Sequence, residues 1–120
     1  MKKTKIIHVV KGRADPNTLN GVNKWIHNVA TVQKKNGTDV EVWGITNNIN
    51  SHKHNHTYKL NLLKQNQIFN FLDKEIIKNK YYLKKKIIFH FHSVYIYEYY
   101  KMSKKIQNYG IKWILSPHGG

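Results

Sequence analysis

Hydrophobic residues in this chain form short compact runs and longer amphipathic stretches, separated by polar segments. The compact runs predict five strands, at 5–10, 39–45, 58–62, 87–91 and 112–116, the first of them buried. The amphipathic stretches predict three helices, because their apolar residues recur at the spacing of one helical face. These faces are Val22, Trp25, Ile26, Val29 and Ala30; Ile68, Phe69, Leu72 and Ile76; and Ile96, Tyr99, Ser103 and Ile106.

Several residues mark where these helices begin and end. Asn36-Gly37 predicts the end of the first helix and Gly110 the end of the third, because glycine accepts the left-handed conformation that follows a last turn. The second helix is expected over 65–79, and Ser93 is expected to cap the third. The alternating strands and helices predict one α/β domain with a parallel sheet and right-handed crossovers.

Composition supports a folded domain and excludes some chemistry. The chain has 120 residues, of which 40% are hydrophobic and 22% charged, as in globular proteins. It has no cysteine, which excludes a disulfide scaffold, a cysteine zinc module and a thiol nucleophile. Lys2, Lys3 and Lys5 precede only a short apolar run, unlike a secretory leader, so we expect the chain to act in the cytoplasm.

The net charge of +15 is only a weak indication of a nucleic-acid partner. All but one of the 21 basic residues are lysine, whereas arginine is the residue favoured for bidentate contacts with bases and phosphates. The abundance of Lys, Asn, Ile and Tyr matches an AT-rich coding sequence. We therefore interpret the excess of lysine first as a solvated surface. Binding to the anionic inner face of a membrane is the second interpretation, and binding to nucleic acid is the last.

Glycine and histidine gather where a ligand site is expected. In an open parallel sheet, ligands bind beyond the carboxyl ends of the strands. The segments 11–21, 90–93 and 116–120 lie at those ends and hold four of the seven glycines, both prolines and three of the eight histidines. Asn20-Gly21 leads into the first helix, whose unpaired N–H groups attract anions; a plain asparagine-capped helix start is the alternative.

Three of these histidines carry different expectations. His90 and His92 share one face of their strand. We expect His90 to be a hydrogen-bonded core residue, and His92 to reach a ligand because it lies nearest the strand end. His118 stands between Pro117 and Gly119 in a turn, where a packing role is not expected.

The sequence does not predict a nucleotide-binding motif, an acid–base pair or a metal site. The dinucleotide-binding and P-loop glycine patterns are both missing, so no cofactor is predicted. Only Asp15 of the six carboxylates lies in a ligand loop, which leaves no acid–base pair. His52, His54 and His56 alternate like metal ligands but lack supporting carboxylates, so we interpret 46–57 as a polar surface loop and predict no metal.

Five segments together carry a resemblance. They are 5–10, Asn20-Gly21-Val22, 36–42, His90-Phe91-His92-Ser93 and 110–119, which closes on Pro117-His118-Gly119. In this order and spacing they resemble the N-terminal half of family-4 glycosyltransferases of the GT-B architecture, which have two Rossmann-like domains facing each other across a cleft. The resemblance implies a Rossmann-like, open, mostly parallel sheet over 1–120, with helices on its faces.

The same resemblance implies a function. These enzymes transfer a sugar from a nucleotide-sugar donor with retention of configuration, and many build bacterial surface polysaccharides or glycolipids on lipid-linked acceptors. The N-terminal domain mainly holds the acceptor. The matching substrate-binding residues are Asn20, Gly21, Val22, His92, Ser93, His118 and Gly119. No catalytic residue is assigned.

Two departures from the family pattern shape the expectation. Asn20 stands where the family usually has a glycine. The C-terminal domain, which holds most of the nucleotide-sugar donor, does not follow Gly120, so we expect an acceptor-side fragment that is inactive alone. The alternatives are a basic, non-enzymatic module for nucleic acid or anionic lipid, a metal-binding protein using the loop histidines, and a flavodoxin-like domain.

Overall fold

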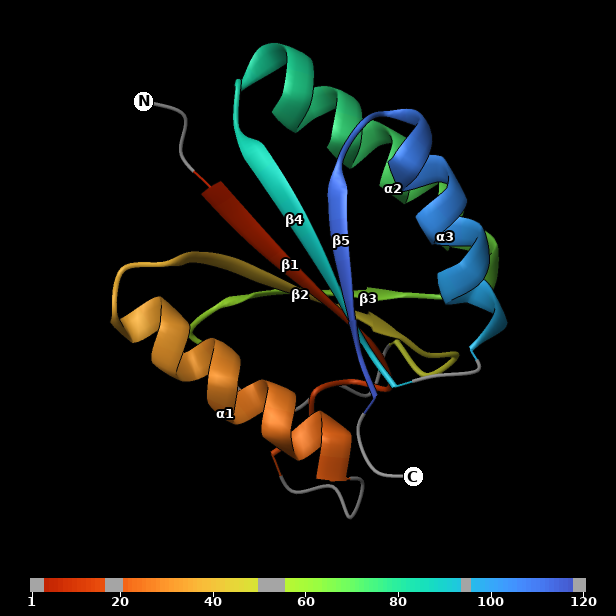
Figure 1. Ribbon diagram of the computed structural model, residues 1–120. Helices are drawn as coiled ribbons and strands as arrows, with labels where there is room; N and C mark the ends of the chain where they lie inside the picture. Colours follow the sequence, from red (N-terminus) through yellow and green to blue (C-terminus); the bar gives the residue numbers. More distant parts are fainter. Residues whose placement is uncertain (1–3, 17–20, 50–55, 94–95, 118–120) are drawn as a thin grey trace.

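A five-stranded parallel sheet organises the chain (Figure 1). The computed structural model describes residues 4–16, 21–49, 56–93 and 96–117. The strands are β1 (Thr4–Lys11), β2 (Asp39–Ile45), β3 (Lys59–Leu63), β4 (Lys86–His92) and β5 (Lys112–Ser116). Their order in the sheet is β3-β2-β1-β4-β5, and all four neighbouring pairs are parallel.

Helices cover both faces of this sheet (Figure 1). One face carries α1 (Gly21–Lys35), and the other carries α2 (Ile68–Ile77) and α3 (Tyr97–Asn108). The sheet and its three helices form a Rossmann-like α/β fold, which confirms the predicted fold class. The second predicted helix is more varied than expected: a 3-10 turn (Gln65–Gln67) precedes α2 and a π-helical turn (Lys78–Tyr82) follows it.

The central strand separates two hydrophobic cores. Successive side chains of a strand point to opposite faces, so β1 contributes Ile7 and Val9 to one core and Val10 to the other. The larger core lies under α2 and α3 and includes Trp43, Phe89, Phe91, Leu72, Ile76, Met102 and Ile106. The smaller lies under α1 and includes Ile26, Ala30, Val40 and Val42. Burial on both faces explains why β1, β2 and β4 appear in the sequence as nearly continuous apolar runs, whereas β5, at the edge of the sheet, has no buried residue.

The predicted helix ends are confirmed, but one predicted cap is wrong. Gly37 and Gly110 have φ angles of 88° and 71°, and the Thr38 N–H donates to the Gln33 carbonyl at 2.9 Å, which closes the last turn of α1. Ser93 does not cap α3, whose N-cap is Ile96. Instead Ser93 has a φ of 91° and its N–H donates to the Ser116 carbonyl at 2.9 Å, so it extends the pairing of β4 with β5.

Among the described residues, we find no helix with the length and apolar character needed to cross a membrane.

Candidate functional site

The loop that leaves β1 is held by a side chain from α1. Asn23 is buried, its Oδ1 accepts the Ala14 N–H at 2.8 Å, and its Nδ2 donates to the Lys11 carbonyl at 3.0 Å. Ala14 is itself buried with a positive φ of 50°, a strained conformation for a residue with a Cβ. Asn23 therefore fixes this loop at the carboxyl end of the central strand. Sequence reasoning missed it, because an asparagine in a helix resembles any other polar position.

The same loop lies directly on the end of β2. The Gly12 N–H donates to the Ile45 carbonyl at 2.8 Å, and a Cβ placed on Gly44 would lie 2.3 Å from the Gly12 carbonyl oxygen. This contact allows only glycine at position 44. The first loop is thus anchored on two sides, by β2 and by α1, before the chain enters the helix.

The first residue of α1 has room around it. A Cβ on Gly21 would meet nothing within 4 Å among the described residues. Val22, the next predicted site residue, is half-buried and packs against the smaller core. Asn20, His118 and Gly119 lie outside the described residues.

Three histidines meet on the face of the sheet that carries α1. His8 on β1 is the register partner of His90 on β4, and His92 lies two residues further along β4 on the same face. The His8 Nδ1 and His92 Nε2 atoms are 2.9 Å apart. The ring centroids lie 5.0 Å (His8–His92), 5.4 Å (His8–His90) and 4.1 Å (His90–His92) from one another.

Burial of the two β4 histidines is the reverse of the prediction. His92, expected to reach a ligand at the strand end, is 0% exposed, whereas His90, expected in the core, is half-buried. The physical reason is the position of α1, which packs on β2 and β1 and reaches the end of β4 through Trp25, while β5 beyond it has no buried residue. The Trp25 ring, on α1, lies 5.6 Å from the His92 ring and closes over it.

Hydrogen bonds determine which ring nitrogens of His8 and His92 carry a proton. The Gln33 Oε1 atom, an acceptor, lies 2.8 Å from the His8 Nε2, so that nitrogen carries the proton and donates. The His8 Nδ1 is then an acceptor, and the His92 Nε2–H donates to it. Desolvation lowers the pKa of His8 below its ordinary value of 6.5, against the smaller opposing effect of the Gln33 hydrogen bond. His8 is therefore neutral at pH 7.

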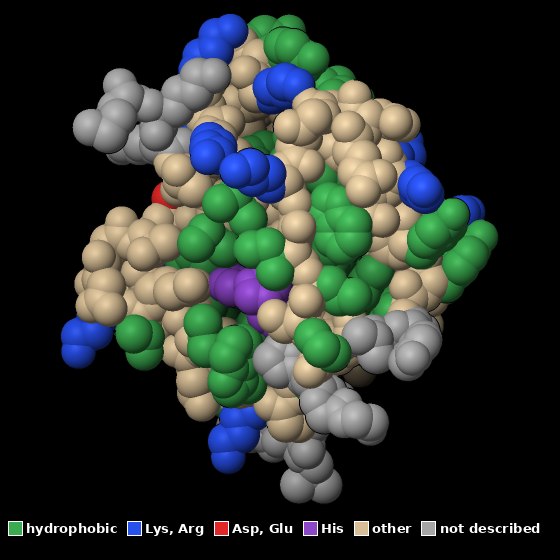
Figure 2. Space-filling view, viewed as in Figure 1, with side chains coloured by type: hydrophobic (Ala, Val, Ile, Leu, Met, Phe, Trp, Pro, Cys, Tyr) green, Lys and Arg blue, Asp and Glu red, His purple; other side chains and the backbone are tan. Residues whose placement is uncertain are grey.

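The cluster reaches the surface through its least buried member. The His90 Nε2 and the Ser116 Oγ of β5 are 2.5 Å apart, which links the cluster to the last strand. Figure 2 shows histidine side chains at the surface in the middle of the view, surrounded by hydrophobic side chains. Trp25 and Ile114, 44% and 50% exposed, contribute to the apolar surroundings of this face.

A cavity lies on the opposite face, beside α3. Its volume is about 480 Å³, and its lining includes Ser93, Ile96, Tyr97, Tyr100, Trp113 and Leu115. The lining is largely aromatic and apolar with few polar groups, as in many small-molecule sites. Beneath it the Tyr99 hydroxyl donates to the carbonyls of Val9 at 3.3 Å and His92 at 3.0 Å, so Tyr99 joins the carboxyl ends of β1 and β4.

Of the three histidines in the loop over 46–57, the structure describes His56. His52 and His54 lie outside the described residues. His56 is half-buried, and its Nε2 lies 3.2 Å from the Ala14 carbonyl oxygen of the first loop. Its ring also packs against those of His27 and Tyr58, with centroids 5.1 Å and 5.0 Å away. His56 thus supports the loop after β1.

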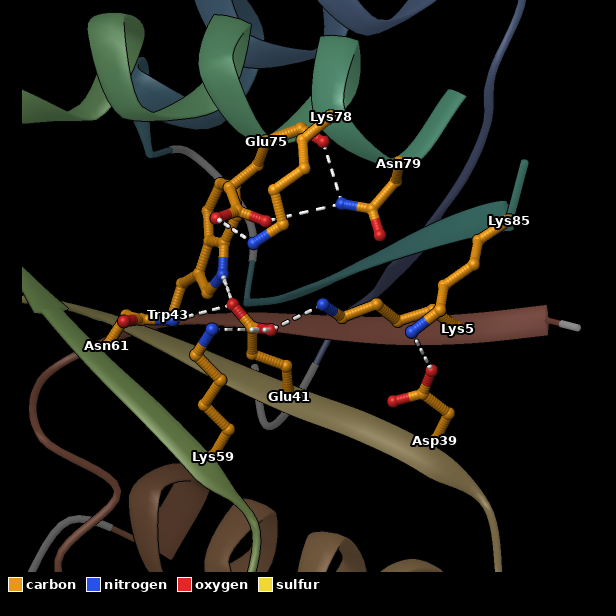
Figure 3. Close-up of polar contacts among 10 residues, drawn as sticks. All are labelled: Lys5, Asp39, Glu41, Trp43, Lys59, Asn61, Glu75, Lys78, Asn79 and Lys85. Carbon is orange, nitrogen blue, oxygen red and sulfur yellow. Dashed lines mark hydrogen bonds and ion pairs between the residues drawn. The ribbon is translucent and has the colours of Figure 1, made fainter. Parts of the chain in front are cut away.

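A second buried polar cluster lies on the α2 side of the sheet, toward the amino ends of the strands (Figure 3). Glu41 on β2 is 0% exposed, and its carboxylate lies 2.7 Å from the Lys5 Nζ and 3.9 Å from the Lys59 Nζ. The Trp43 indole N–H and the Asn61 amide each donate to its Oε2 at 2.6 Å. We call these five residues the Glu41 cluster. It lies away from the carboxyl ends of the strands, and its Lys59 side chain, 55% exposed, reaches the surface.

Comparison with families of known proteins, with curated proteins and with solved structures found no match to this chain. The case for a function therefore depends on the residues and their arrangement.

Proposed function

We propose that this chain is the acceptor-side domain of a retaining glycosyltransferase that uses a nucleotide-sugar donor. The supporting observation is where the resembling segments fall. The strand order reverses between β1 and β4, which is the point where ligands bind in open α/β sheets. Gly21 follows the first of these strands, and His92 and Ser93 end the second.

The aromatic cavity beside α3 is the proposed acceptor site. It opens next to Ser93, at the carboxyl end of β4, and presents Tyr97, Tyr100 and Trp113. Aromatic rings offer broad apolar faces with polar edges, which suit a ligand that is part sugar and part hydrocarbon. A sugar or lipid-linked acceptor has that mixed character, as do the acceptors of the bacterial polysaccharide- and glycolipid-building enzymes that the chain resembles.

This domain would contribute positioning to the reaction. Acceptor contacts hold the attacking hydroxyl in place, which removes much of the entropic barrier of a two-substrate reaction. The start of α1 at Gly21 would face the donor phosphates, as the resemblance implies. In that family most stabilisation of the leaving phosphate belongs to a separate donor-binding domain, so residues 1–120 by themselves should turn over no nucleotide sugar.

Acceptor binding is tested by NMR on the full chain. We would titrate it with butyl glycosides of glucose, galactose, mannose and N-acetylglucosamine and follow the Ser93 amide and the Trp113 indole N–H. At least one glycoside should shift both signals. Tyr97→Ala should weaken that binding, whereas the matched variant Tyr82→Ala should not; these tyrosines are 68% and 78% exposed, and only Tyr97 lines the cavity.

Two results would contradict the proposal. The first is that no glycoside shifts the cavity signals. The second is strong binding of oligonucleotides or anionic vesicles that falls steeply with salt, with shifts spread over the lysine-rich surface, because counterion release dominates such binding. That result would favour the basic, non-enzymatic module instead.

A further inference from the structure

We propose that His8, His90 and His92 form a binding site for one transition-metal ion of the zinc class. One ring nitrogen from each of the three histidines lies within 4.8 Å of the others. The proposal is independent of the glycosyltransferase function, because it depends only on these side chains and their neighbours.

The sheet itself brings the three imidazoles together. His8 and His90 are register partners on adjacent parallel strands, and His92 follows two residues later on the same face. Their backbones are therefore fixed by the hydrogen bonding of β1 and β4, the two strands at the centre of the fold. Ligands on rigid strands are held more precisely than ligands on loops.

The spacing of the two buried nitrogens is close to what a metal requires. The His8 Nδ1 and His92 Nε2 face each other at 2.9 Å. Two imidazole nitrogens at any two corners of a tetrahedral zinc site, each about 2.05 Å from the ion, lie about 3.3 Å apart. A separation wider by a few tenths of an ångström, with a rotation of the two rings that turns both nitrogens toward one ion, therefore converts this hydrogen bond into a pair of ligands. The proton now between the rings moves to the other nitrogen of His92.

The outer contacts are those that metal-bound histidines make. A ligating imidazole usually donates its second N–H to a carbonyl or similar acceptor, which fixes its orientation. The His8 Nε2 already does this to the Gln33 Oε1 at 2.8 Å, leaving Nδ1 for the ion. The His90 Nε2 contacts the Ser116 Oγ at 2.5 Å, which orients the third ring.

The ligand chemistry selects the class of ion. Three imidazoles with no carboxylate among the clustered ligands favour Zn²⁺, Cu²⁺ or Ni²⁺ over Mg²⁺ or Ca²⁺. Three protein ligands leave a fourth position for water or another small ligand, as in open rather than closed zinc sites. Because His90 is half-buried and histidines reach the surface on this face (Figure 2), an ion has a route to the cluster.

The test is a zinc titration of the full chain, with the ion as the only probe. Calorimetry should give one ion per chain at this site, and Co²⁺ should produce the visible absorption bands of a nitrogen-ligated tetrahedral ion. His90→Gln removes a ligand at the partly exposed position and should weaken zinc binding more than tenfold. Gln33→Ala removes only the outer contact to His8 and should weaken it about 10–100-fold.

The matched control separates this site from the loop histidines. A variant with His52→Gln, His54→Gln and His56→Gln should keep zinc affinity at the cluster within twofold. The circular-dichroism spectrum of each variant checks its fold, and Gln33→Ala serves if His90→Gln does not fold. The proposal is overturned if the unmodified chain binds no zinc, if affinity is unchanged in both His90→Gln and Gln33→Ala, or if the loop variant loses the binding.

Discussion

The Glu41 cluster and the histidine cluster are both buried polar groups in the same sheet, yet they differ in almost every other respect. The Glu41 cluster faces α2 with one carboxylate, two lysines and two N–H donors around it. The histidine cluster faces α1, is built of three imidazole rings, and reaches the surface at His90. The first satisfies fixed charges among its own members, whereas the second keeps nitrogen lone pairs that a proton or a metal ion can use.

This difference bears on stability and on the proposed metal site. The charged cluster links β1, β2 and β3, because Lys5, Glu41 and Asn61 come one from each strand. The histidine cluster offers the ligands of the proposed ion and should contribute less to stability. Buried ion pairs are costly to break but not strongly stabilising in themselves, so each cluster should respond to mutation in its own way.

The largest effect is expected at Glu41. Glu41→Ala leaves the Lys5 ammonium buried without its partner, since the side chain of Lys5 is only 8% exposed. Removing one member of a buried pair costs about 3–5 kcal/mol in free energy of unfolding. Urea denaturation should show this loss. A destabilisation below that of an ordinary surface substitution would mean that the Glu41 cluster is not structural.

His8 should give a smaller, pH-dependent effect. His8→Gln disturbs hydrogen bonds to His92 and Gln33, at a cost of about 1–3 kcal/mol at pH 7 for buried groups left without a partner. The lowered pKa of His8 means that the unfolded chain takes up the proton first, so this residue reduces stability as the pH falls below 6.5 and has no such effect above it.

The contribution of the His8 proton is isolated by comparing how the free energy of unfolding depends on pH in two proteins. Urea unfolding of the unmodified chain and of His8→Gln, at several pH values on both sides of 6.5 and with a chelator present, should give a shallower acid slope for the variant. The nearby titratable groups are His90 and His92, which both proteins keep. Equal slopes in the two proteins would contradict burial of a neutral His8.

Tyr99 links the backbones of β1 and β4, the two strands that carry the histidines. Tyr99→Phe removes the hydroxyl that donates to the Val9 and His92 carbonyls, and we expect a loss of about 0.5–1.5 kcal/mol in unfolding free energy. The control is Tyr82→Phe, at a residue 78% exposed, which should change nothing measurable. Equal stability of the two variants would show that this hydroxyl does not tie β1 to β4.

The smallest effect is expected at Asp39. Its carboxylate lies 3.1 Å from the Lys85 Nζ, but both side chains are partly exposed, at 37% and 27%. Asp39→Ala should therefore cost no more than about 1 kcal/mol, as exposed pairs generally do. Measured beside Glu41→Ala, it separates the effect of burial from that of charge; a loss as large as that of Glu41→Ala would contradict the distinction.

Much of the fold was predictable because its signals are local. The apolar runs of the strands, the face of α2 and the glycines that end α1 and α3 each act within a few residues. The histidine cluster was not predictable in the same way. Alternation places His90 and His92 on one face, but only the register of β1 against β4 brings His8 opposite them, and only the position of α1 decides which of them is buried.

The role of Ser93 shows the same limit. A serine just before a helical pattern is an ordinary cap, and nothing local indicates that β5 will return to bond its N–H. Asn23 acts nine residues back along the chain, on Ala14, so its role depends on how the first loop folds. In each case the decisive partner is distant in sequence, whereas propensity and spacing report only near neighbours.

The position of β1 in the middle of the sheet also affects how the chain folds during synthesis. β1 pairs on one side with β2, but its other neighbour, β4, is made much later, after β3 and α2. Until then one edge of this central strand remains open, and contacts between distant segments form slowly. A nascent chain that ends before Lys86 therefore exposes an unpaired apolar strand edge, which is the stage at which chaperones should bind it most strongly.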